Sequence, residues 1–459
     1  MKDKIPEDVL SIYKRLENSG FEVYFVGGCV RNILLQKNPK DWDLTTNATP
    51  AEIQSVFPDS FYDNSFGTVG IPLPQVPEDE HKGVVEITTY RNEGTYKDHR
   101  KPETVSWGKT IEEDLKRRDF TMNAIAFQIE EDSTNSFKYV DPFDGIKDIE
   151  LKLIKAVGDP NARFKEDALR LMRAVRLATQ LDFSIDETTL VAICRDAQLI
   201  KHVSGERIRD ELIKILASER AYDGIMLLDS TGLLQYILPE LEIGKGVSQE
   251  RPGRHHTADV FTHNVLSLKH TPATDPLVRL ATLLHDAGKP MVRSEDSQGL
   301  VIFYNHEIAG AKIAREVAER LHLSKKDREK IMTLIRWHMF TVDEHITDSA
   351  IRRFIRRVGI ENVKDMIDLR IGDRLGSGTQ TAESWRLRQF KERIVKELNP
   401  PFSVNDLLID GNDIMQILHI KPGPKIGEIL QKIFLEVDEN LELNNREYLL
   451  KRITELGNN

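Results

Sequence analysis

Two aspartates near the amino end have a spacing that suits metal-ion chemistry. Asp41 and Asp43 flank Trp42 in the segment KDWDLTTNA, whose pattern predicts a β-strand. Because alternate residues of a strand face the same side, the two carboxylates are expected to converge. Carboxylates are preferred ligands of Mg²⁺, and two such ions can stabilise an attacking hydroxyl and a leaving pyrophosphate. An isolated Asp-x-Asp also fits a solvated strand end or a helix cap.

A glycine pair and an arginine precede these aspartates in the run FVGGCVRN. Gly27 and Gly28 allow backbone N–H groups to approach a phosphate closely, and Arg31, near the start of a predicted helix, adds charge for the same anion. A glycine pair alone is most often only a turn. The order of strand, glycine turn, helix and aspartate pair favours the joint interpretation.

Two further segments of the amino-terminal part carry candidate residues. Glu86 interrupts the apolar run VVEITTYR and is a candidate third acid, because a buried acid needs a partner; an edge strand facing water is the alternative. In DLKRRDFTMNAIAF, Arg117 and Arg118 are suited to hold a triphosphate while Asp119 accepts a hydrogen bond from a ribose hydroxyl. A surface ion pair is the alternative for this second segment.

The segment FKEDALRLMRAVR places an acid and three arginines along one predicted helix. Asp167 and Arg170 are three residues apart and are expected to be neighbours on one helix face, which Arg173 and Arg176 continue. An aspartate and an arginine held together can pair with the edge of cytosine or adenine. The alternative is an ion pair that supports a solvated helix.

The elements that position these residues predict an α+β multidomain protein. Short β-rich runs such as FEVYFVGG, GTVGIPL and AIAFQI follow an opening amphipathic helix, and helical periodicity dominates after DPFDG. Polar or proline-rich breaks occur near 242–258 and 398–403. We therefore expect an α/β head with a mixed sheet at 1–145, and then three all-α domains, a neck at 146–242, a middle domain at 258–398 and a tail at 399–459.

Composition narrows the possible partners and the compartment. A net charge of −10 argues against a surface that binds nucleic acid by charge alone, so an RNA partner needs a local basic region and no DNA partner is expected. Cys29 and Cys194 are the only cysteines, and no apolar run is long enough to span a bilayer. These features predict a cytoplasmic protein without membrane insertion.

Taken together, the motifs resemble those of class II tRNA nucleotidyltransferases, the family of CCA-adding, A-adding and CC-adding enzymes and bacterial poly(A) polymerases. GGCVRN with DWD is similar to the metal-binding motif, RRDFTMNA to the ribose-reading motif, EDALRLMRAVR to the base-selecting motif and GERIRDEL to a helix-stabilising motif. The resemblance implies a nucleotidyltransferase-type head, tRNA as acceptor, and CTP and ATP as substrates. It implies that Asp41 and Asp43 bind the metal ions and that Gly28 and Arg31 contact the phosphates. It also implies that Arg118 and Asp119 lie near the sugar and that Asp167 and Arg170 select the base.

Two features separate members of this family. Asn32 replaces the aspartate that usually follows the arginine, which is expected to alter local orientation and to leave the DWD pair functional. Residues 91–107 resemble the flexible loop of members that add the terminal A, which disfavours a CC-only enzyme. A poly(A) polymerase is disfavoured because the chain has no GRRFRL-like segment and no basic tail. Full CCA addition and A-only addition both remain open.

A second predicted metal site lies in the helical part of the chain. Imidazoles and carboxylates together favour Ni²⁺, Mn²⁺, Co²⁺ or Fe over Ca²⁺, and a charged aspartate in the apolar setting ATLLHDAGKP needs a partner. A lone helical histidine is usually only a packed or surface residue. The order of these residues resembles the HD phosphohydrolase superfamily, which implies phosphatase or 2′,3′-cyclic phosphodiesterase activity. The candidate ligands are His263, His285, Asp286, His306, His338 and Asp373.

The carboxyl-terminal segment DGNDIMQILHIKPGPKIGEIL resembles the tail of HD-containing family members, which implies contact with the tRNA elbow. Its KPGPKIG turn is suited to present backbone N–H groups to a phosphate, or it simply connects two helices. Two different classes of function stay open beside nucleotide addition. One is an HD metallophosphohydrolase whose head only binds nucleotide or RNA, and the other is an RNA-binding scaffold without catalysis.

Overall fold

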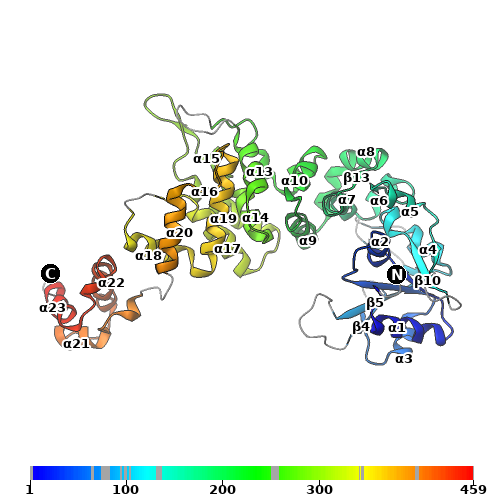
Figure 1. Ribbon diagram of the computed structural model, residues 1–459, viewed down its shortest axis with the longest axis horizontal. Coiled ribbons are helices and arrows are strands. Elements are labelled where there is room, and N and C mark those ends of the chain that lie inside the picture. Colours follow the sequence, from blue (N-terminus) through cyan, green and yellow to red (C-terminus); the bar gives the residue numbers. More distant parts are fainter. Residues whose placement is uncertain are drawn as a thin grey trace. The chain divides into compact units, whose positions relative to one another are not determined.

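The computed structural model forms two compact units, Met1–Pro239 and Glu240–Asn459, which are treated separately below (Figure 1). The predicted domain boundaries within these units stay predictions. Both predicted breaks fall partly on residues outside the described chain. The structure describes residues 4–63, 67–73, 83–93, 96–97, 101–102, 105–130, 137–249, 258–340, 342, 346–397 and 403–457.

Unit 1 begins with a seven-stranded mixed sheet, as the sequence predicts. Its strand order is β11-β10-β1-β2-β5-β4-β3, in which β2 and β5 are parallel and every other pair is antiparallel. The strands are β1 (Val23–Val26), β2 (Trp42–Thr46), β3 (Phe61–Asp63), β4 (Thr68–Pro72), β5 (Val84–Thr89), β10 (Ala126–Ile129) and β11 (Phe137–Val140).

The two faces of this sheet have different roles. On one face Phe25 stacks between Tyr13 of α1 (Glu7–Asn18) and Phe127, with ring centroids 5.2 and 4.8 Å away, and Trp42 meets Phe25 edge-on. Burial of this aromatic cluster fixes the register, because a shift of one residue would turn each side chain to the other face. The residues that alternate with Trp42 therefore lie on the opposite face, where Asp43 is found.

The remaining elements of unit 1 are mostly helical. Two short strands, β12 (Leu153–Ile154) and β13 (Ser184–Ile185), interrupt the all-α pattern that the sequence predicts. The described parts of the predicted flexible loop form two short pairs, β6 (Arg91–Glu93) with β9 (Val105–Trp107) and β7 (Tyr96–Lys97) with β8 (Lys101–Pro102); residues 94–95, 98–100 and 103–104 lie outside the described chain. The helices are α2 (Gly28–Leu34), α3 (Pro50–Val56), α4 (Ile111–Lys116), α5 (Gly145–Glu150), α6 (Pro160–Glu166), α7 (Leu169–Leu181), α8 (Glu187–Asp196), α9 (Gly205–Leu216), α10 (Ala221–Ser230) and α11 (Leu234–Ile237). The short helix α12 (Pro239–Glu242) spans the boundary between the two units.

The helix expected across FKEDALRLMRAVR is broken, so this prediction is wrong. Asp167 follows α6 in an extended conformation, with φ −138° and ψ 105°, and α7 begins only at Leu169. One carboxylate oxygen of Asp167 accepts the N–H of Leu169 at 3.1 Å. Aspartate often satisfies the first N–H groups of a helix in this way, and such a bond favours a new helix start.

Among the described residues of unit 2, the regular elements are helices except for one short antiparallel pair, β14 (Ser294–Glu295) and β15 (Val301–Ile302). Its central helices, α13 and α19, pack side by side, and α16 packs on α17. The helices are α13 (Val260–His270), α14 (Pro276–Leu284), α15 (Lys289–Val292), α16 (His306–Arg320), α17 (Lys325–Trp337), α18 (Asp348–Val358), α19 (Val363–Gly376), α20 (Trp385–Glu397), α21 (Gly411–Leu418), α22 (Pro424–Glu439) and α23 (Arg446–Gly457).

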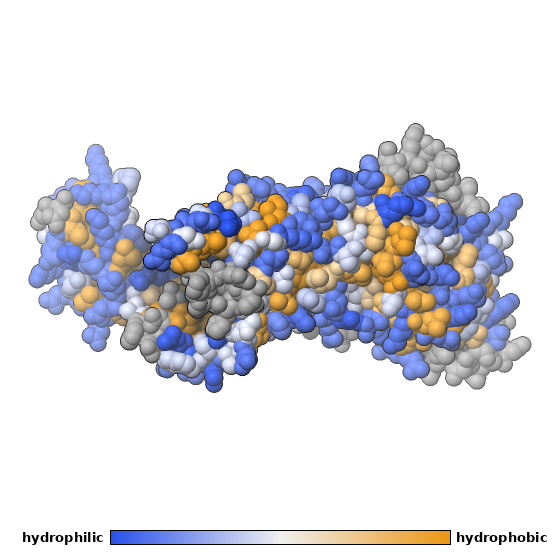
Figure 2. Space-filling model, turned by 90° about the horizontal axis from the view of Figure 1, so that it is seen from above, coloured by the Kyte–Doolittle hydropathy of each residue, from blue (hydrophilic) through white to orange (hydrophobic). Residues whose placement is uncertain are grey.

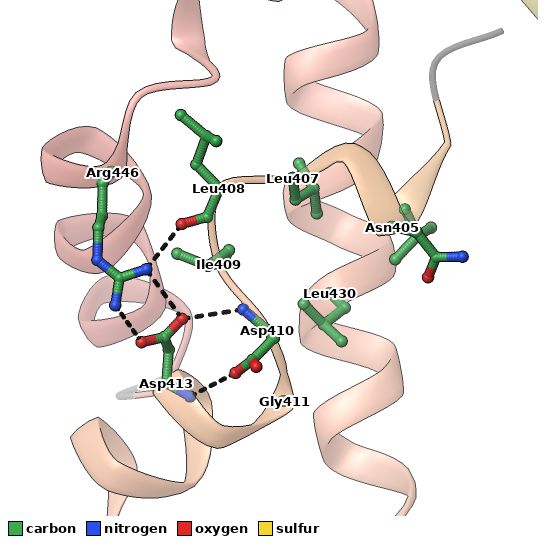
Figure 3. A pocket seen from close by; sticks show the side chains of 10 residues that line it. Asn405, Leu407, Leu408, Ile409, Asp410, Gly411, Asp413, Leu430 and Arg446 are labelled. Atoms are coloured by element: carbon green, nitrogen blue, oxygen red, sulfur yellow. Dashed lines mark hydrogen bonds and ion pairs between the residues drawn. The ribbon is translucent and has the colours of Figure 1, made fainter. Parts of the chain in front are cut away.

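The last three helices surround their own apolar core, which includes Ile414, Ile433 and Ile453. Arg446 of α23 binds Asp413 of α21 and the carbonyl of Leu408, which closes this small bundle (Figure 3). The KPGPKIG segment connects α21 to α22, which begins at Pro424.

A buried ion pair joins this small bundle to α18. Arg352 of α18 donates to Asp438 of α22 at 2.8 Å, and Asp438 is 1% exposed. Arg356 donates to the other carboxylate oxygen at 2.6 Å. Two arginines thus compensate the charge of one buried carboxylate.

Hydrophilic residues cover most of the face shown in Figure 2, and apolar side chains appear among them in small groups. Within the described residues, no helix combines the length and the apolar character that crossing a membrane requires.

Candidate functional site

Asp43 and Glu86 lie on the same face of the sheet in unit 1, and the charge of Asp41 also acts on Asp43. Asp43 is directly opposite Glu86 in the parallel β2–β5 pair, and Asp41 immediately precedes β2. Like charges facing each other across strands are destabilising. Burial, together with the charges of Glu86 and Asp41, raises the pKa of Asp43 to about 6. β5 lies between β2 and β4, so Glu86 is not on an edge strand, although its side chain is exposed.

Gly27 allows the backbone to pass close to this acidic group. Its φ of 74° lies in the left-handed region, and a Cβ there would approach Arg118 Nη1 to 3.1 Å and Asp43 Oδ2 to 3.3 Å. Arg118 also binds the buried carboxylate of Asp114 at 3.0 Å. Arg118 Nε is buried and has no hydrogen-bond acceptor within the described part of the chain. A buried donor without an acceptor beside a glycine turn fits an anionic ligand such as a phosphate.

Arg31 extends from α2 toward the same region. Its Nη1 donates to Asn123 Oδ1 at 2.8 Å, and its Nη2 donates to Asn32 Oδ1 at 3.0 Å. Burial and the nearby charge of Arg176 lower the pKa of Arg31 to about 10. Asn32 therefore orients Arg31 through a neutral hydrogen bond, where an aspartate would supply a full negative charge.

Asp119 is buried and held by charged donors. Its Oδ2 accepts from Arg173 Nη2 at 2.6 Å, and its Oδ1 accepts from Asn123 Nδ2 at 3.1 Å. Burial alone would raise the pKa of Asp119, but the charges of Arg173 and Arg170 hold it well below its ordinary value. The surface ion pair considered for this segment is thus wrong for Asp119. Arg117 instead pairs with Asp114, a buried acid that the sequence reasoning did not single out.

Asp167 and Arg170 do not pair with each other. Asp167 accepts two hydrogen bonds from Arg207 of α9, at 3.1 and 2.7 Å, whereas Arg170 binds Glu166 at 2.7 Å. The expected placement of Asp167 and Arg170 on one face of a single helix is wrong, because α7 begins after Asp167. The motif GERIRDEL pointed to this region, but only the packing of α7 on α9 shows that Arg207 is the partner.

The same helix pair positions the last arginine of the row. Arg176 Nε donates to Glu211 of α9 at 2.5 Å, and Glu211 is buried. All three arginines predicted to lie along one helix thus have acidic partners on other elements, Arg170 on Glu166 of α6, Arg173 on Asp119 and Arg176 on Glu211.

In unit 2, the six predicted ligands converge on one buried point. Asp286 Oδ2 lies 3.3 Å from His263 Nε2 and 3.4 Å from His285 Nε2. Asp286 Oδ1 lies 3.2 Å from His306 Nε2 and 3.7 Å from His338 Nε2. Two groups thus share Asp286, each with two imidazoles, and each has its ligand atoms within 4.8 Å of one another.

The sixth ligand and the backbone complete this cluster. Asp373 Oδ1 lies 3.3 Å from His263 Nε2, on the Oδ2 side of Asp286. His285, His306 and His338 each direct Nδ1 to a backbone carbonyl, at 2.7, 2.8 and 2.7 Å. Such bonds fix the ring orientation and leave Nε2 for a metal.

The cluster brings acids and imidazoles together in a buried space, so a cation would compete with protons. Burial and the charge of His285 lower the pKa of His338 to about 3, which keeps that imidazole neutral as a ligand requires. Burial would lower the pKa of His285, but Asp286 and Asp373 raise it to about 10. A bound metal would replace that proton.

Lys289 is a further charged residue that the sequence reasoning did not single out. Its Nζ lies 2.5 Å from Asp286 Oδ2 and 2.5 Å from Gln249 Oε1. The motif HDAGK places it three residues after Asp286, a spacing that predicts contact on a helical turn.

Family models match three consecutive parts of the chain. Residues 23–155 match "Poly A polymerase head domain", residues 182–243 match "Probable RNA and SrmB- binding site of polymerase A", and residues 256–374 match "HD domain". A mixed-sheet head with facing carboxylates, a helical RNA-binding part and a histidine–aspartate cluster define a nucleotidyltransferase joined to an HD domain.

Full-length relatives give the family. A CCA-adding enzyme of Limosilactobacillus reuteri is 30% identical to this chain, and the match covers 98% of this chain and 96% of that enzyme. A CCA-adding enzyme of Pediococcus pentosaceus is 32% identical, and the match covers 97% of this chain and 96% of that enzyme. The crystal structure of the Bacillus stearothermophilus CCA-adding enzyme in complex with CTP is 26% identical, has a TM-score of 0.68 and covers 98% and 96%. The chain belongs to the class II CCA-adding enzymes.

Proposed function

We propose that this protein rebuilds the CCA end of tRNA from CTP and ATP, with Asp41 and Asp43 as the metal-binding acids and Glu86 beside them. The observation that carries the proposal is the facing pair of Asp43 and Glu86, with Asp41 close by and a raised pKa on Asp43. Three neighbouring acids can bind a divalent cation, which would relieve their mutual repulsion. Mg²⁺ held there would stabilise the developing charge on the attacking 3′-oxygen and the leaving pyrophosphate.

The chain's own residues supply the rest of the site. Gly27 and Gly28 let backbone N–H groups approach the triphosphate, and Arg118 and Arg31 add charge-assisted donors. The buried Nε of Arg118 supports this role, because a phosphate oxygen would give it an acceptor. Asp119, ionised and held by Arg173, can accept a hydrogen bond from a ribose hydroxyl.

Base selection is assigned to Asp167 and Arg170, with Arg207 as a positioning residue. The two-fold hydrogen bond from Arg207 fixes the orientation of the Asp167 carboxylate. Arg170 is held by Glu166 and by the carbonyl of Arg117 at 2.9 Å. A rigid donor and a rigid acceptor can discriminate the Watson–Crick edges of cytosine and adenine from those of other bases.

Primer extension tests this proposal and separates it from A-only addition. Three tRNA primers, ending before CC, in C and in CC, are each incubated with CTP, ATP or both, with Mg²⁺. The proposal expects all three to reach CCA, whereas an A-adding enzyme extends only the CC primer. The full-length relatives described as CCA-adding enzymes favour the first outcome. No extension of any primer, or no release of pyrophosphate, would refute nucleotide addition altogether.

We also propose a second activity in unit 2, the hydrolysis of a phosphomonoester or a 2′,3′-cyclic phosphodiester. The observation in favour is the convergence of four imidazoles on Asp286, in two groups that share this carboxylate, with Asp373 Oδ1 3.3 Å from His263 Nε2. This donor set fits Ni²⁺, Mn²⁺, Co²⁺ or Fe, and a bound ion would lower the pKa of a water that attacks phosphorus. Lys289 keeps Asp286 ionised and can neutralise charge on the substrate phosphate.

Metal analysis and substitution test this second activity. The purified protein is expected to contain a transition metal that is lost in Asp286→Ala and retained in Asp43→Asn. Hydrolysis of 2′,3′-cyclic AMP should likewise be lost in Asp286→Ala and retained in Asp43→Asn. CCA addition should instead be lost in Asp43→Asn and retained in Asp286→Ala. A protein in which Asp43→Asn leaves its main activity untouched would instead be chiefly a phosphohydrolase.

The two described cysteines are both free, which is in keeping with the reducing cytoplasm that we propose as its compartment.

A further inference from the structure

A pocket of about 540 Å³ opens beside the histidine–aspartate cluster of unit 2. One wall begins directly after His338, where Met339 and Phe340 line the space. Met339 is 59% exposed, and Phe340 stacks on Phe390 of α20 with ring centroids 5.5 Å apart. The chain that supplies a cluster imidazole thus continues into the wall of the pocket.

A second wall comes from α19, the helix that carries Asp373. Arg370 and Arg374 both line the pocket, three residues before and one residue after Asp373. Arg370 Nη1 lies 2.9 Å from Asp373 Oδ2, and its guanidinium lies 5.7 Å from the centre of the Phe340 ring. A group bound between Arg370 and Phe340 is therefore only one side chain away from the cluster.

The third wall is the start of α20, which adds an exposed aromatic ring and more positive charge. Trp385 is 49% exposed, and the Arg386 guanidinium lies 5.5 Å from the centre of its ring. Among the described residues that line the pocket, none is acidic, whereas the whole chain has a net charge of −10. The described lining is thus cationic, with the three arginines Arg370, Arg374 and Arg386.

We propose that this pocket binds the nucleotide part of a phosphoester whose phosphate reaches the histidine–aspartate cluster; this rests on the hydrolase function proposed above. The base stacks on Trp385, and Arg370 and Arg374 hold the phosphate side of the nucleotide. Aromatic rings bind any base through its π face, and arginines match phosphate oxygens with paired N–H donors. The volume lies within the roughly 300–1,000 Å³ typical of small-molecule sites. A free nucleotide and the 3′-terminal nucleotide of an RNA share this chemistry.

Binding to the metal-loaded, full-length protein tests this assignment without turnover. Isothermal titration calorimetry uses adenosine 2′,3′-cyclic phosphorothioate, a slowly hydrolysed analogue, and separately a short oligoribonucleotide that ends in a 2′,3′-cyclic phosphate. Trp385→Ala is expected to weaken binding at least about fivefold, because a lost base stack costs this much or more. Arg386→Ala should weaken it by a similar factor, because it removes a positive charge from the pocket lining and the guanidinium that lies 5.5 Å from the Trp385 ring. Trp385→Phe, which keeps an aromatic face, should stay within about twofold of the wild type.

Arg388→Ala is the matched control, because Arg388 is an exposed arginine on the same helix that does not line the pocket. Weakening with the mononucleotide, with the oligoribonucleotide or with both supports the proposal and identifies the source of the ligand. Absence of binding, or equal affinities in all five proteins, overturns it. A cluster without metal would instead defeat the hydrolase proposal, whereas metal with unchanged affinities defeats the pocket alone.

Discussion

Replacing Asp43 by Asn is expected to stabilise the metal-free protein while it abolishes nucleotide addition. Burial, with the charges of Glu86 and Asp41, raises the pKa of Asp43 from 3.8 to about 6. Because a one-unit change in pKa corresponds to about 1.4 kcal/mol, the ionised Asp43 carboxylate lowers the free energy of unfolding at pH 8 by about 3 kcal/mol. A neutral amide of the same shape removes this penalty. Loss of the metal ligand should reduce CCA addition on the order of a thousandfold or more.

The effect of Asp43→Asn on the free energy of unfolding should depend on pH. The penalty in the wild type is fully present above pH 6 and is lost as the pH falls toward 3.8, because the folded protein then binds a proton that the unfolded chain does not. The gain in Asp43→Asn should therefore shrink to roughly half at pH 5. Urea or thermal unfolding of unit 1 at pH 8 and pH 5, with a chelator present, measures this difference. Mg²⁺ should then stabilise the wild type more than the variant.

Asp41→Asn is the matched control, because Asp41 is exposed and precedes the strand. It should lose nucleotide addition to a similar extent and raise the free energy of unfolding much less than Asp43→Asn does, because it removes only the charge of Asp41 and leaves the buried Asp43 carboxylate in place. The reasoning is refuted if Asp43→Asn is no more stable than the wild type at pH 8. A stability gain that is the same at both pH values would also refute it.

Three further substitutions probe the head, the base-selecting contact and the tail. Gly27→Ala is expected to reduce nucleotide addition at least tenfold and to destabilise unit 1, since φ is 74° and Arg118 would lie 3.1 Å from the new Cβ. The control is Gly28→Ala, whose Cβ would meet nothing closer than 3.6 Å. It should have a smaller effect in the same kinetic and unfolding assays. Arg207→Ala should relax the preference for CTP and ATP over GTP and UTP more than it lowers the rate with the correct nucleotides, as misincorporation assays would reveal. Arg352→Ala leaves a buried carboxylate on α22 with one arginine fewer and should destabilise unit 2 by about 3 kcal/mol or more in urea unfolding, whereas equal stability would show that the pair is not needed.

Local sequence determined the elements that present the chemistry. The alternation around Trp42, the glycine turn at Gly27 and the helical periodicity after residue 145 predicted a mixed-sheet head followed by helices, and the fold has this architecture. The prediction succeeded because burial of one face of a strand or helix leaves a periodic record in the sequence. The sequence also predicted that the histidines and aspartates of unit 2 meet, since a charged aspartate in an apolar setting needs a partner, and five of the six form two buried groups that could hold a metal ion.

Tertiary structure alone decided which side chains pair with the predicted site residues. Nothing in the spacing of FKEDALRLMRAVR excluded an Asp167–Arg170 pair, yet the chain breaks at Asp167 and brings Arg207 to it from α9. The pairing of β2 with β5 likewise placed Glu86 opposite Asp43 and away from a sheet edge. Side-chain partners from distant segments depend on how packed elements meet, and a local pattern carries no record of that geometry.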